Sequence, residues 1–198
     1  FGSRILPGHT YGSVVQISER FAEVINQELK GLVAAGAEWI QLDEPARTNV
    51  TGAEMARLFN LATEGVNAKL GFHVCFGNRY GRGRFKRSYR PLFPGLLDTR
   101  CDQFVLEFAS RELSEIDLWK EYGGDRELAA GVVDVKSFYP ETPEDVADRA
   151  RALLTVCRPE KLSLCPDCGF GWSPRNMAVG KLQALAAGAK IIRKELAG

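Results

Sequence analysis

Apolar and polar residues alternate along the chain with two different periods. Residues 18–35 carry apolar side chains three or four positions apart, which predicts an amphipathic helix with Ser18 as its starting cap and Gly36 after its end. The next run, residues 38–45 (EWIQLDEP), is short and closes at Pro45, so it predicts a strand. This unit of one helix and one strand recurs along the rest of the chain.

The same alternation continues towards the carboxyl terminus. Further strands are predicted at residues 69–75, 103–108, 128–135 and 161–169, and further helices at 53–66, 110–122, 142–156 and 173–196. Two of these helices have clear starting signals, because Thr142 precedes Pro143 and Ser173 precedes Pro174. A basic stretch and a possible helix occupy residues 78–98.

About five strands, each followed by a helical segment, predict an α/β fold in which helices cover parallel strands. Two architectures fit this order, a doubly wound open sheet and a (β/α)8 TIM barrel. A complete barrel needs about 250 residues and would have about three more strand–helix units than this chain, so a barrel here would be partial. The length of 198 residues also fits one domain, and we treat residues 1–198 as a single domain.

Composition and charge narrow the class of protein. Apolar residues make up 45% of the chain, enough for a core, and the net charge of +1 gives no field that attracts nucleic acid or an anionic membrane. No apolar run reaches the roughly 18 residues of a membrane helix, and the first residues lack a signal-peptide pattern. The five cysteines are odd in number and unevenly spaced, which favours a reducing, cytoplasmic setting over a disulfide framework.

Titratable or metal-binding residues stand at the end of every predicted strand. In parallel α/β folds these ends meet along one rim, where the working face lies. The rim residues are Asp43, Glu44, His73, Cys75, Glu107, Asp134, Lys136, Cys165, Asp167 and Cys168. Packing alone does not explain five such ends in a row, because the adjoining core positions prefer Val, Ile and Leu. The rim is therefore the candidate functional site.

His73 and Cys75 lie two residues apart in a predicted strand, so their side chains project to the same side. Imidazole nitrogen and thiolate sulfur are common zinc ligands, and Glu107 with Cys168 or Cys165 could complete a set of four. A lone His-x-Cys is more often core filling, and a lone Cys-x-x-Cys also occurs in redox motifs and zinc ribbons. Their joint occurrence on one rim favours a zinc site.

Five motifs in this order resemble a known family. They are QLDEPA at 41–46, HVC at 73–75, VLEF at 105–108, GVVDVKS at 131–137 and PDCG at 166–169. The ordered set is similar to the catalytic barrel of cobalamin-independent methionine synthase and its smaller single-barrel relatives. The resemblance extends from about residue 18 to the end of the chain. It implies that this chain covers about the last five strand–helix units of a TIM barrel.

The resemblance also implies roles for the rim residues. A catalytic zinc ion would be bound by His73, Cys75, Glu107 and Cys168, with Cys168 preferred over Cys165 because it lies in Pro-Asp-Cys-Gly. Asp43 matches the residue that holds the amino group of homocysteine, and we group its neighbour Glu44 with it as substrate-binding.

One position departs from the family pattern. Lys136 stands where larger members commonly have a histidine proposed for proton transfer. Asp134 and Lys136 are nevertheless the candidate catalytic residues, and a structural salt bridge is the alternative for both.

The implied activity is a zinc-dependent S-methyltransferase that converts homocysteine to methionine with methyltetrahydrofolate or a related methyl donor. The alternatives are an alkyltransferase acting on another thiol, such as coenzyme M, and a non-catalytic zinc-binding barrel fragment. The expected partners are a small thiol and a methyl donor, with no nucleic acid and no membrane, and the chain is a possible homo-oligomer.

Basic residues gather directly after the predicted zinc-binding strand. Residues 77–90 (GNRYGRGRFKRSYR) would lie over the barrel mouth and could bind an anionic donor, with a solvated mobile loop as the alternative. RNA binding is disfavoured, because the rest of the chain is neutral. Arg175, at the start of the last predicted helix, is a second candidate for binding an anion or pairing with an acid.

Overall fold

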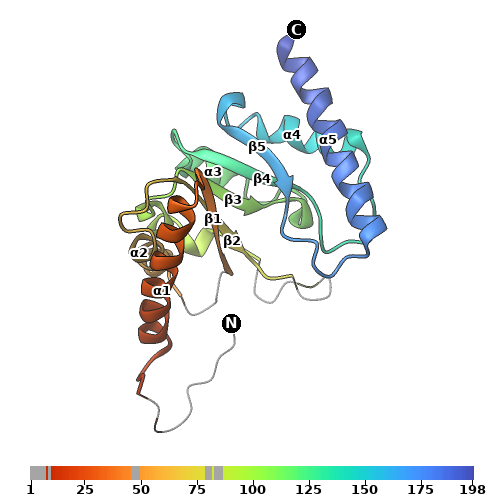
Figure 1. The fold of residues 1–198 in the computed structure, drawn as a ribbon. Helices are drawn as coiled ribbons and strands as arrows, with labels where there is room; N and C mark the ends of the chain where they lie inside the picture. Colours follow the sequence, from red (N-terminus) through yellow and green to blue (C-terminus); the bar gives the residue numbers. More distant parts are fainter. Residues whose placement is uncertain (1–7, 9, 46–49, 79–81, 83–86) are drawn as a thin grey trace.

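The computed structural model describes residues 8, 10–45, 50–78, 82 and 87–198 (Figure 1). One parallel sheet forms the centre of the fold, with strands β1 (Trp39–Pro45), β2 (Lys69–Cys75), β3 (Gln103–Glu107), β4 (Glu127–Val133) and β5 (Leu162–Pro166). The helices are α1 (Val14–Ala34), α2 (Gly52–Ala62), α3 (Asp117–Tyr122), α4 (Pro143–Leu153) and α5 (Arg175–Ala197). Short 3-10 turns are η1 (Arg90–Leu92), η2 (Gly95–Asp98), η3 (Ala109–Arg111) and η4 (Pro159–Lys161).

The order of the strands in the sheet decides between the two predicted architectures. Each strand pairs in parallel with the next one along the chain, in the order β1-β2-β3-β4-β5. A doubly wound sheet reverses its strand order at a switch point, whereas a barrel keeps consecutive strands side by side. The α/β partial barrel is therefore confirmed, and within the described residues no strand pairs β1 with β5.

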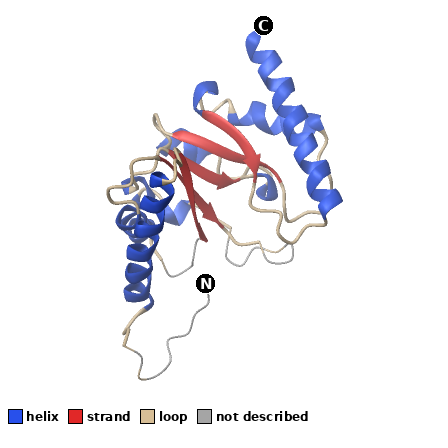
Figure 2. Ribbon diagram, in the orientation of Figure 1, coloured by secondary structure: helices blue, strands red, loops and turns tan. Residues whose placement is uncertain are grey.

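Helices flank the sheet at both ends (Figures 1 and 2). Helices α1 and α2 pack together beside β1 and β2, and α4 and α5 pack together beside β4 and β5. None of the described helices combines the length and the apolar character that crossing a bilayer requires. The strands therefore lie between two helix pairs, and their carboxyl ends share one edge.

The starts of α1, α2 and α4 follow local capping chemistry, whereas α3 and α5 begin without a side-chain cap. Thr51 and Thr142 each form a capping box with an acidic residue three positions on, at the starts of α2 and α4. The predicted start of the first helix at Ser18 is wrong, because Ser13 caps it by accepting a hydrogen bond from the Gln16 N–H. The Ser173 cap is also wrong, because α5 begins after Pro174 without a side-chain cap.

The predicted helix at 110–122 is divided into two pieces. A 3-10 turn, η3, ends before Glu112, and α3 starts only at Asp117. Between them Glu112, Leu113 and Glu115 have positive φ angles of 51°, 59° and 67°, which an α-helix cannot contain. The possible helix within 78–98 is present only as η1 and η2, and residues 79–81 and 83–86 lie outside the described part of the chain.

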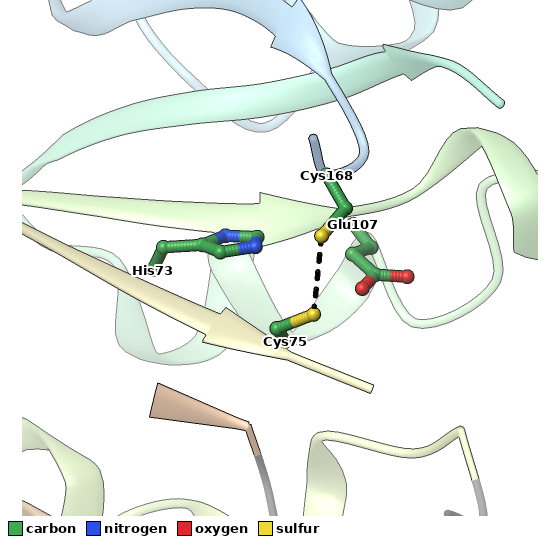
Figure 3. Close-up of side chains that lie close together, drawn as sticks. All are labelled: His73, Cys75, Glu107 and Cys168. Atoms are coloured by element: carbon green, nitrogen blue, oxygen red, sulfur yellow. Dashed lines mark hydrogen bonds between the residues drawn. The ribbon is translucent and has the colours of Figure 1, made fainter. Parts of the chain in front are cut away.

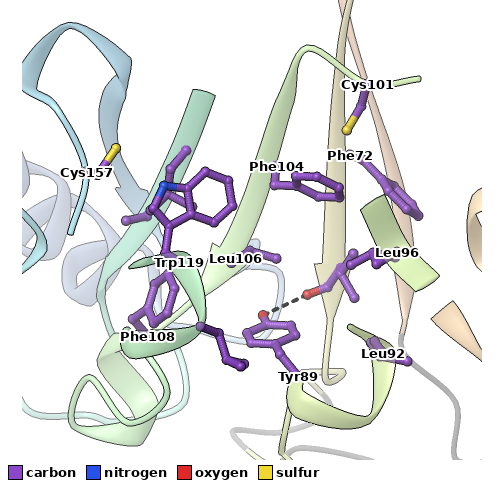
Figure 4. Packing of buried hydrophobic residues seen from close by; sticks show 14 of the residues in the cluster. Phe72, Tyr89, Leu92, Leu96, Cys101, Phe104, Leu106, Phe108, Trp119 and Cys157 are labelled. Carbon is purple, nitrogen blue, oxygen red and sulfur yellow. Dashed lines mark hydrogen bonds between the residues drawn. The ribbon is translucent and has the colours of Figure 1, made fainter. Parts of the chain in front are cut away.

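A continuous apolar core covers one face of the central strands (Figure 4). Phe72 of β2 contacts Phe59 of α2 at a ring-centroid distance of 4.5 Å and Phe104 of β3 at 6.3 Å. Tyr89, which is buried in this core, donates its hydroxyl hydrogen to the Val74 carbonyl at 2.9 Å. The alternation along β2 therefore turns Phe72 and Val74 towards the helices and leaves His73 and Cys75 for the opposite face.

Candidate metal centre

Four side chains from three strands converge at the carboxyl edge of the sheet (Figure 3). His73 and Cys75 come from β2, Glu107 ends β3, and Cys168 follows β5. One ligand atom from each residue lies within 4.8 Å of all the others. Strands that are adjacent or nearly adjacent in a parallel sheet thus bring residues 73 and 168 into one cluster, although they lie far apart in sequence.

His73 is oriented with one ring nitrogen free. Its Nδ1 lies 3.0 Å from the carbonyl oxygen of Val105, which can only accept a hydrogen, so Nδ1 carries the proton. Nε2 is buried and has no hydrogen-bond partner among the protein atoms. A buried ring nitrogen with an unused lone pair, facing two sulfurs, is the arrangement expected of a metal ligand.

Cys75 and Cys168 face each other as a thiol–thiolate pair. Their sulfur atoms are 3.3 Å apart, and both cysteines are free. The hydrogen bond with Cys75, together with the neighbouring His73, lowers the pKa of Cys168 below its usual range, whereas the same bond and burial raise the pKa of Cys75. The Gly77 N–H also donates to the Cys75 sulfur at 3.1 Å. The pair thus favours the thiolate form of Cys168, which is the form in which cysteine binds metals.

Glu107 is fully buried, and both of its oxygens have partners. The Phe76 N–H donates to Oε1 at 3.0 Å, and the Lys136 ammonium donates to Oε2 at 2.5 Å. Its own N–H donates to the Tyr89 hydroxyl at 2.7 Å. The carboxylate is therefore fixed at the edge of the sulfur pair by Phe76, directly after β2, and by Lys136 on the segment that follows β4.

The donor set fits a zinc ion. Two sulfurs, one imidazole nitrogen and one carboxylate oxygen are ligands that zinc accepts in tetrahedral sites, with bond lengths of about 2.0–2.3 Å. Such bonds place donor atoms roughly 3–4 Å apart, close to the 4.8 Å within which these four lie. The unpartnered Nε2 of His73 supplies the nitrogen lone pair. These residues would hold the ion if zinc is bound.

The two cysteines of the Cys-x-x-Cys motif have different surroundings. Cys168 belongs to the cluster, whereas Cys165 pairs in register with Gly131 inside the sheet. Burial raises the pKa of Cys165 to about 12, so its thiol stays protonated. Among the described residues, the cluster contains the cysteine that the resemblance favoured and not its alternative.

Asp43 and Glu44, near the end of β1, pair in register with His73 and Val74, so their side chains project to opposite faces of the sheet. Asp43 is exposed, stands opposite His73 in the strand register, and accepts a hydrogen bond from Gln41 Nε2 at 2.8 Å. Glu44 is half-buried, and that burial raises its pKa to about 7. Asp43 is thus available to a cation, while Glu44 carries a proton for part of the time at neutral pH.

Asp134 and Lys136 have different orientations. The Lys136 side chain reaches Glu107, whereas the Asp134 carboxylate accepts the backbone N–H of Lys136 at 2.7 Å. The structure therefore brings Lys136 into contact with the cluster, and the described contacts of Asp134 lie within its own loop.

Asp167 is a site residue whose role the sequence did not reveal. Its carboxylate accepts the backbone N–H groups of Phe108, Ala109 and Ser110 at 3.0, 2.9 and 2.6 Å. A side chain at Gly131 could not fit, because a Cβ there would lie 2.2 Å from the Asp167 carboxylate. Asp167 thus ties the segment after Glu107 to the residue before Cys168. The Pro-Asp-Cys-Gly motif marks its position, but no spacing indicates the backbone groups that it binds.

The basic segment is described only in part. Arg87 donates to the Ser110 carbonyl at 2.8 Å, and Arg90 pairs with Asp117 at 2.8 Å. Arg79, Arg84 and Lys86 lie outside the described residues. The two described arginines with known partners therefore fasten this segment to η3 and α3, and anion binding stays a prediction.

The fold and the site together define a barrel-type α/β protein with a candidate metal-ligand cluster at the carboxyl ends of its strands. The chain belongs to the family described as "Cobalamin-independent synthase, Catalytic domain", which matches residues 13–191. This confirms the resemblance seen in the five sequence motifs.

Several relatives carry the name methionine synthase. One from Saccharolobus islandicus (strain Y.G.57.14 / Yellowstone #1) is 41% identical over 180 residues, covering 88% of this chain and 50% of the relative. Another, from Sulfurisphaera tokodaii, is 38% identical over 188 residues, covering 94% of this chain and 52% of the relative. The chain therefore spans about half the length of the curated relatives it matches.

A solved structure shares the fold. The B12-independent methionine synthase from Shewanella sp. W3-18-1, in complex with selenomethionine, matches with a TM-score of 0.83 and 34% sequence identity, covering 94% of this chain and 57% of that chain. The five-stranded sheet thus corresponds to part of the barrel of that enzyme.

Proposed function

We propose that this chain carries the zinc centre of a thiol methyltransferase, with homocysteine as the acceptor and methyltetrahydrofolate or a related compound as the methyl donor. The observation that carries the proposal is the convergence of His73, Cys75, Glu107 and Cys168 at the carboxyl edge of the sheet. Relatives named methionine synthase at about 40% identity support the activity.

The chemistry needs a thiolate at neutral pH. A free thiol has a pKa of about 8.5 and is mostly protonated, and zinc, when bound, would supply the positive charge that keeps a substrate thiol deprotonated. In the overall reaction a sulfur–carbon bond forms and the bond between the methyl carbon and its donor breaks. The thiol proton ends on the departing donor group, so that atoms and charge balance.

The proposal gives particular roles to four rim residues, Glu107, Asp43, Lys136 and Asp134. Glu107 is the only oxygen donor among the four candidate ligands, and a carboxylate would be held less firmly by zinc than a thiolate or imidazole, so Glu107 would be the ligand that makes room for substrate. Asp43, exposed beside His73, would orient the substrate ammonium group. Lys136, in contact with Glu107, and Asp134, in the same loop, are the candidates for proton transfer.

Thiol binding tests this function. Calorimetric titration of homocysteine into the zinc-loaded chain should show binding accompanied by proton release, and the metal-free chain should show neither. Coenzyme M, titrated in parallel, tests the alternative acceptor. A chain that holds zinc tightly and binds no thiol would support the non-catalytic alternative and contradict the proposal.

Replacement of single cysteines tests the ligand set. Cys168→Ser should strongly reduce bound zinc, because it removes one of two thiolate ligands. Cys165→Ser, the matched control three residues away, should leave the zinc content close to that of the wild type, because that thiol lies outside the cluster. Elemental analysis of the purified variants measures both. The reverse pattern would overturn the assignment of Cys168.

A further inference from the structure

A buried lysine is paired with the one carboxylate of the candidate metal centre. The side chains of Lys136 and Glu107 are 5% and 0% exposed, and Nζ lies 2.5 Å from Oε2. Burying two charges costs several kcal/mol per ion in desolvation, so the pair must be tightly held to persist. A buried ion pair contributes little net stability, so its position beside the candidate metal ligands points to a role in the metal centre.

A series of hydrogen bonds holds the loop that carries Lys136. The Lys136 N–H donates to Asp134, and the Asp134 N–H donates to Oε1 of Glu141 at 2.8 Å. Glu141 is itself buried and accepts from the ammonium of Lys181 on α5 at 2.7 Å. Lys136 is therefore held in front of Glu107 by a chain of hydrogen bonds that ends on a helix.

The Glu107 carboxylate has hydrogen-bond partners in the protein that hold it without a metal ion. Its Oε1 accepts from the Phe76 N–H at 3.0 Å and its Oε2 from Lys136. A carboxylate has about four lone-pair sites, so these two bonds leave room for a metal contact. The same carboxylate can therefore be a ligand or remain beside Lys136 without losing its protein partners.

The positive charge of Lys136 favours the binding of a negatively charged substrate thiolate at the centre. Two thiolates and one carboxylate bring one more negative charge than a divalent ion neutralises, and Lys136 offsets that excess. A substrate thiolate would add another negative charge to a water-poor site, where such charges repel strongly. A fixed cation beside the carboxylate reduces this repulsion and draws charge away from Glu107.

We propose that Lys136 is a positioning residue that stabilises the Glu107 carboxylate when a substrate thiolate replaces it as a ligand, an inference that rests on the proposed function. In this role Lys136 acts through Glu107, and the proton transfer for which it is also a candidate is a separate step. It makes Glu107 the ligand that leaves most readily and keeps its carboxylate beside the centre, ready to return.

The Lys136→Met variant tests this role by the directions in which zinc affinity and homocysteine affinity change. Without the cation, the buried Glu107 carboxylate depends more on the metal, so zinc affinity should stay equal or rise. Homocysteine affinity should fall by roughly tenfold or more, the scale on which outer-shell partners act. If Lys136 were merely structural, Glu107 would be misplaced and zinc affinity would fall.

The measurements use zinc competition against a chromophoric chelator and homocysteine titration of the cobalt-substituted chain, followed by its sulfur-to-cobalt absorption band. Lys136→Arg keeps the cation and should keep most of the homocysteine affinity, which covers the case in which Lys136→Met fails to fold. Lys69→Met is the matched control, because Lys69 pairs with Glu127 at 2.6 Å at the opposite end of the sheet. It should change neither affinity.

Two outcomes would overturn the inference. One is a Lys136→Met chain that binds homocysteine as tightly as the wild type, and the other is a loss of zinc affinity in Lys136→Met. A wild-type chain that binds zinc but no homocysteine contradicts the proposed function itself, so the two failures are distinguishable.

Discussion

At the scale of single residues, three of the four candidate ligands are oriented by backbone groups of the protein. The Val105 carbonyl holds Nδ1 of His73, and the Gly77 N–H holds the Cys75 sulfur. The Phe76 N–H holds the Glu107 carboxylate. Such outer contacts fix the orientation of ligands before any metal arrives, which lowers the entropic cost of binding one.

The residue types of the cluster could be predicted from the sequence, and their supports could not. His73, Cys75, Glu107 and Cys168 each stand at a strand end, and a parallel sheet gathers such ends along one edge. Tyr89, by contrast, lies in a segment without periodicity. Its hydroxyl accepts from the Glu107 N–H and donates to the Val74 carbonyl, contacts that only the folded chain creates.

Glu44 provides a pH-dependent prediction. Burial raises its folded pKa from 4.5 to about 7, so the folded state binds a proton that the unfolded state has already lost between these values. The stability that Glu44 contributes to the folded state by holding this proton is fully present below about pH 4.5, and it is lost as the pH rises through about 7. Glu44→Gln should therefore gain free energy of unfolding relative to wild type between pH 5 and about pH 8.

Urea unfolding of both proteins at several pH values in that range measures this difference. Glu64→Gln, a change of the same type at an exposed position, should show no such trend. A constant difference between Glu44→Gln and wild type would show that Glu44 is not destabilised by burial.

At the scale of elements, the centre depends on how the ends of β3 and β5 are tied together. Asp167, after β5, accepts three backbone N–H groups from the segment 108–110 that follows β3. This contact joins the segment that follows Glu107 to the residue before Cys168, although β4 separates their strands. One carboxylate thus sets the spacing between two candidate ligands.

Asp167→Asn should weaken this tie. The amide keeps one oxygen, but its NH2 group replaces the acceptor of the Ser110 N–H, and an unsatisfied buried donor costs about 1–3 kcal/mol. The free energy of unfolding should fall by that amount in urea titrations, and zinc affinity should fall with it. Asp148→Asn on α4, whose side chain is 74% exposed, is the control and should change little. Unchanged stability and zinc affinity in Asp167→Asn would contradict the role of this residue.

The elements were predicted correctly where one spacing of apolar residues dominates the sequence. They were predicted wrongly where residues with left-handed backbone angles interrupt that pattern. All five strands were predicted, because each is a short apolar run between turn signals. The helix predicted at 110–122 was interrupted by left-handed residues at Glu112, Leu113 and Glu115, which no apolar pattern reveals. Helix α1 begins directly after Ser13 and not at the predicted Ser18, whose hydroxyl donates a hydrogen bond to the Val14 carbonyl inside the helix.

At the scale of the whole molecule, one apolar cluster extends from Leu29 in α1 to Cys157 after α4. We therefore propose that residues 1–198 behave as a single domain. Thermal unfolding should show the same midpoint by circular dichroism and by tryptophan fluorescence, as expected for one cooperative unit. Two separate transitions would divide the chain and contradict the single domain.

The central claim is that the four clustered side chains hold zinc and leave it open to a substrate thiol. X-ray absorption at the zinc edge counts the sulfur ligands directly, because zinc–sulfur bonds of about 2.3 Å are longer than zinc–nitrogen and zinc–oxygen bonds. The account predicts two sulfur ligands, from Cys75 and Cys168, in the zinc-loaded chain and a third when homocysteine is added. A sulfur count that homocysteine leaves unchanged would contradict it.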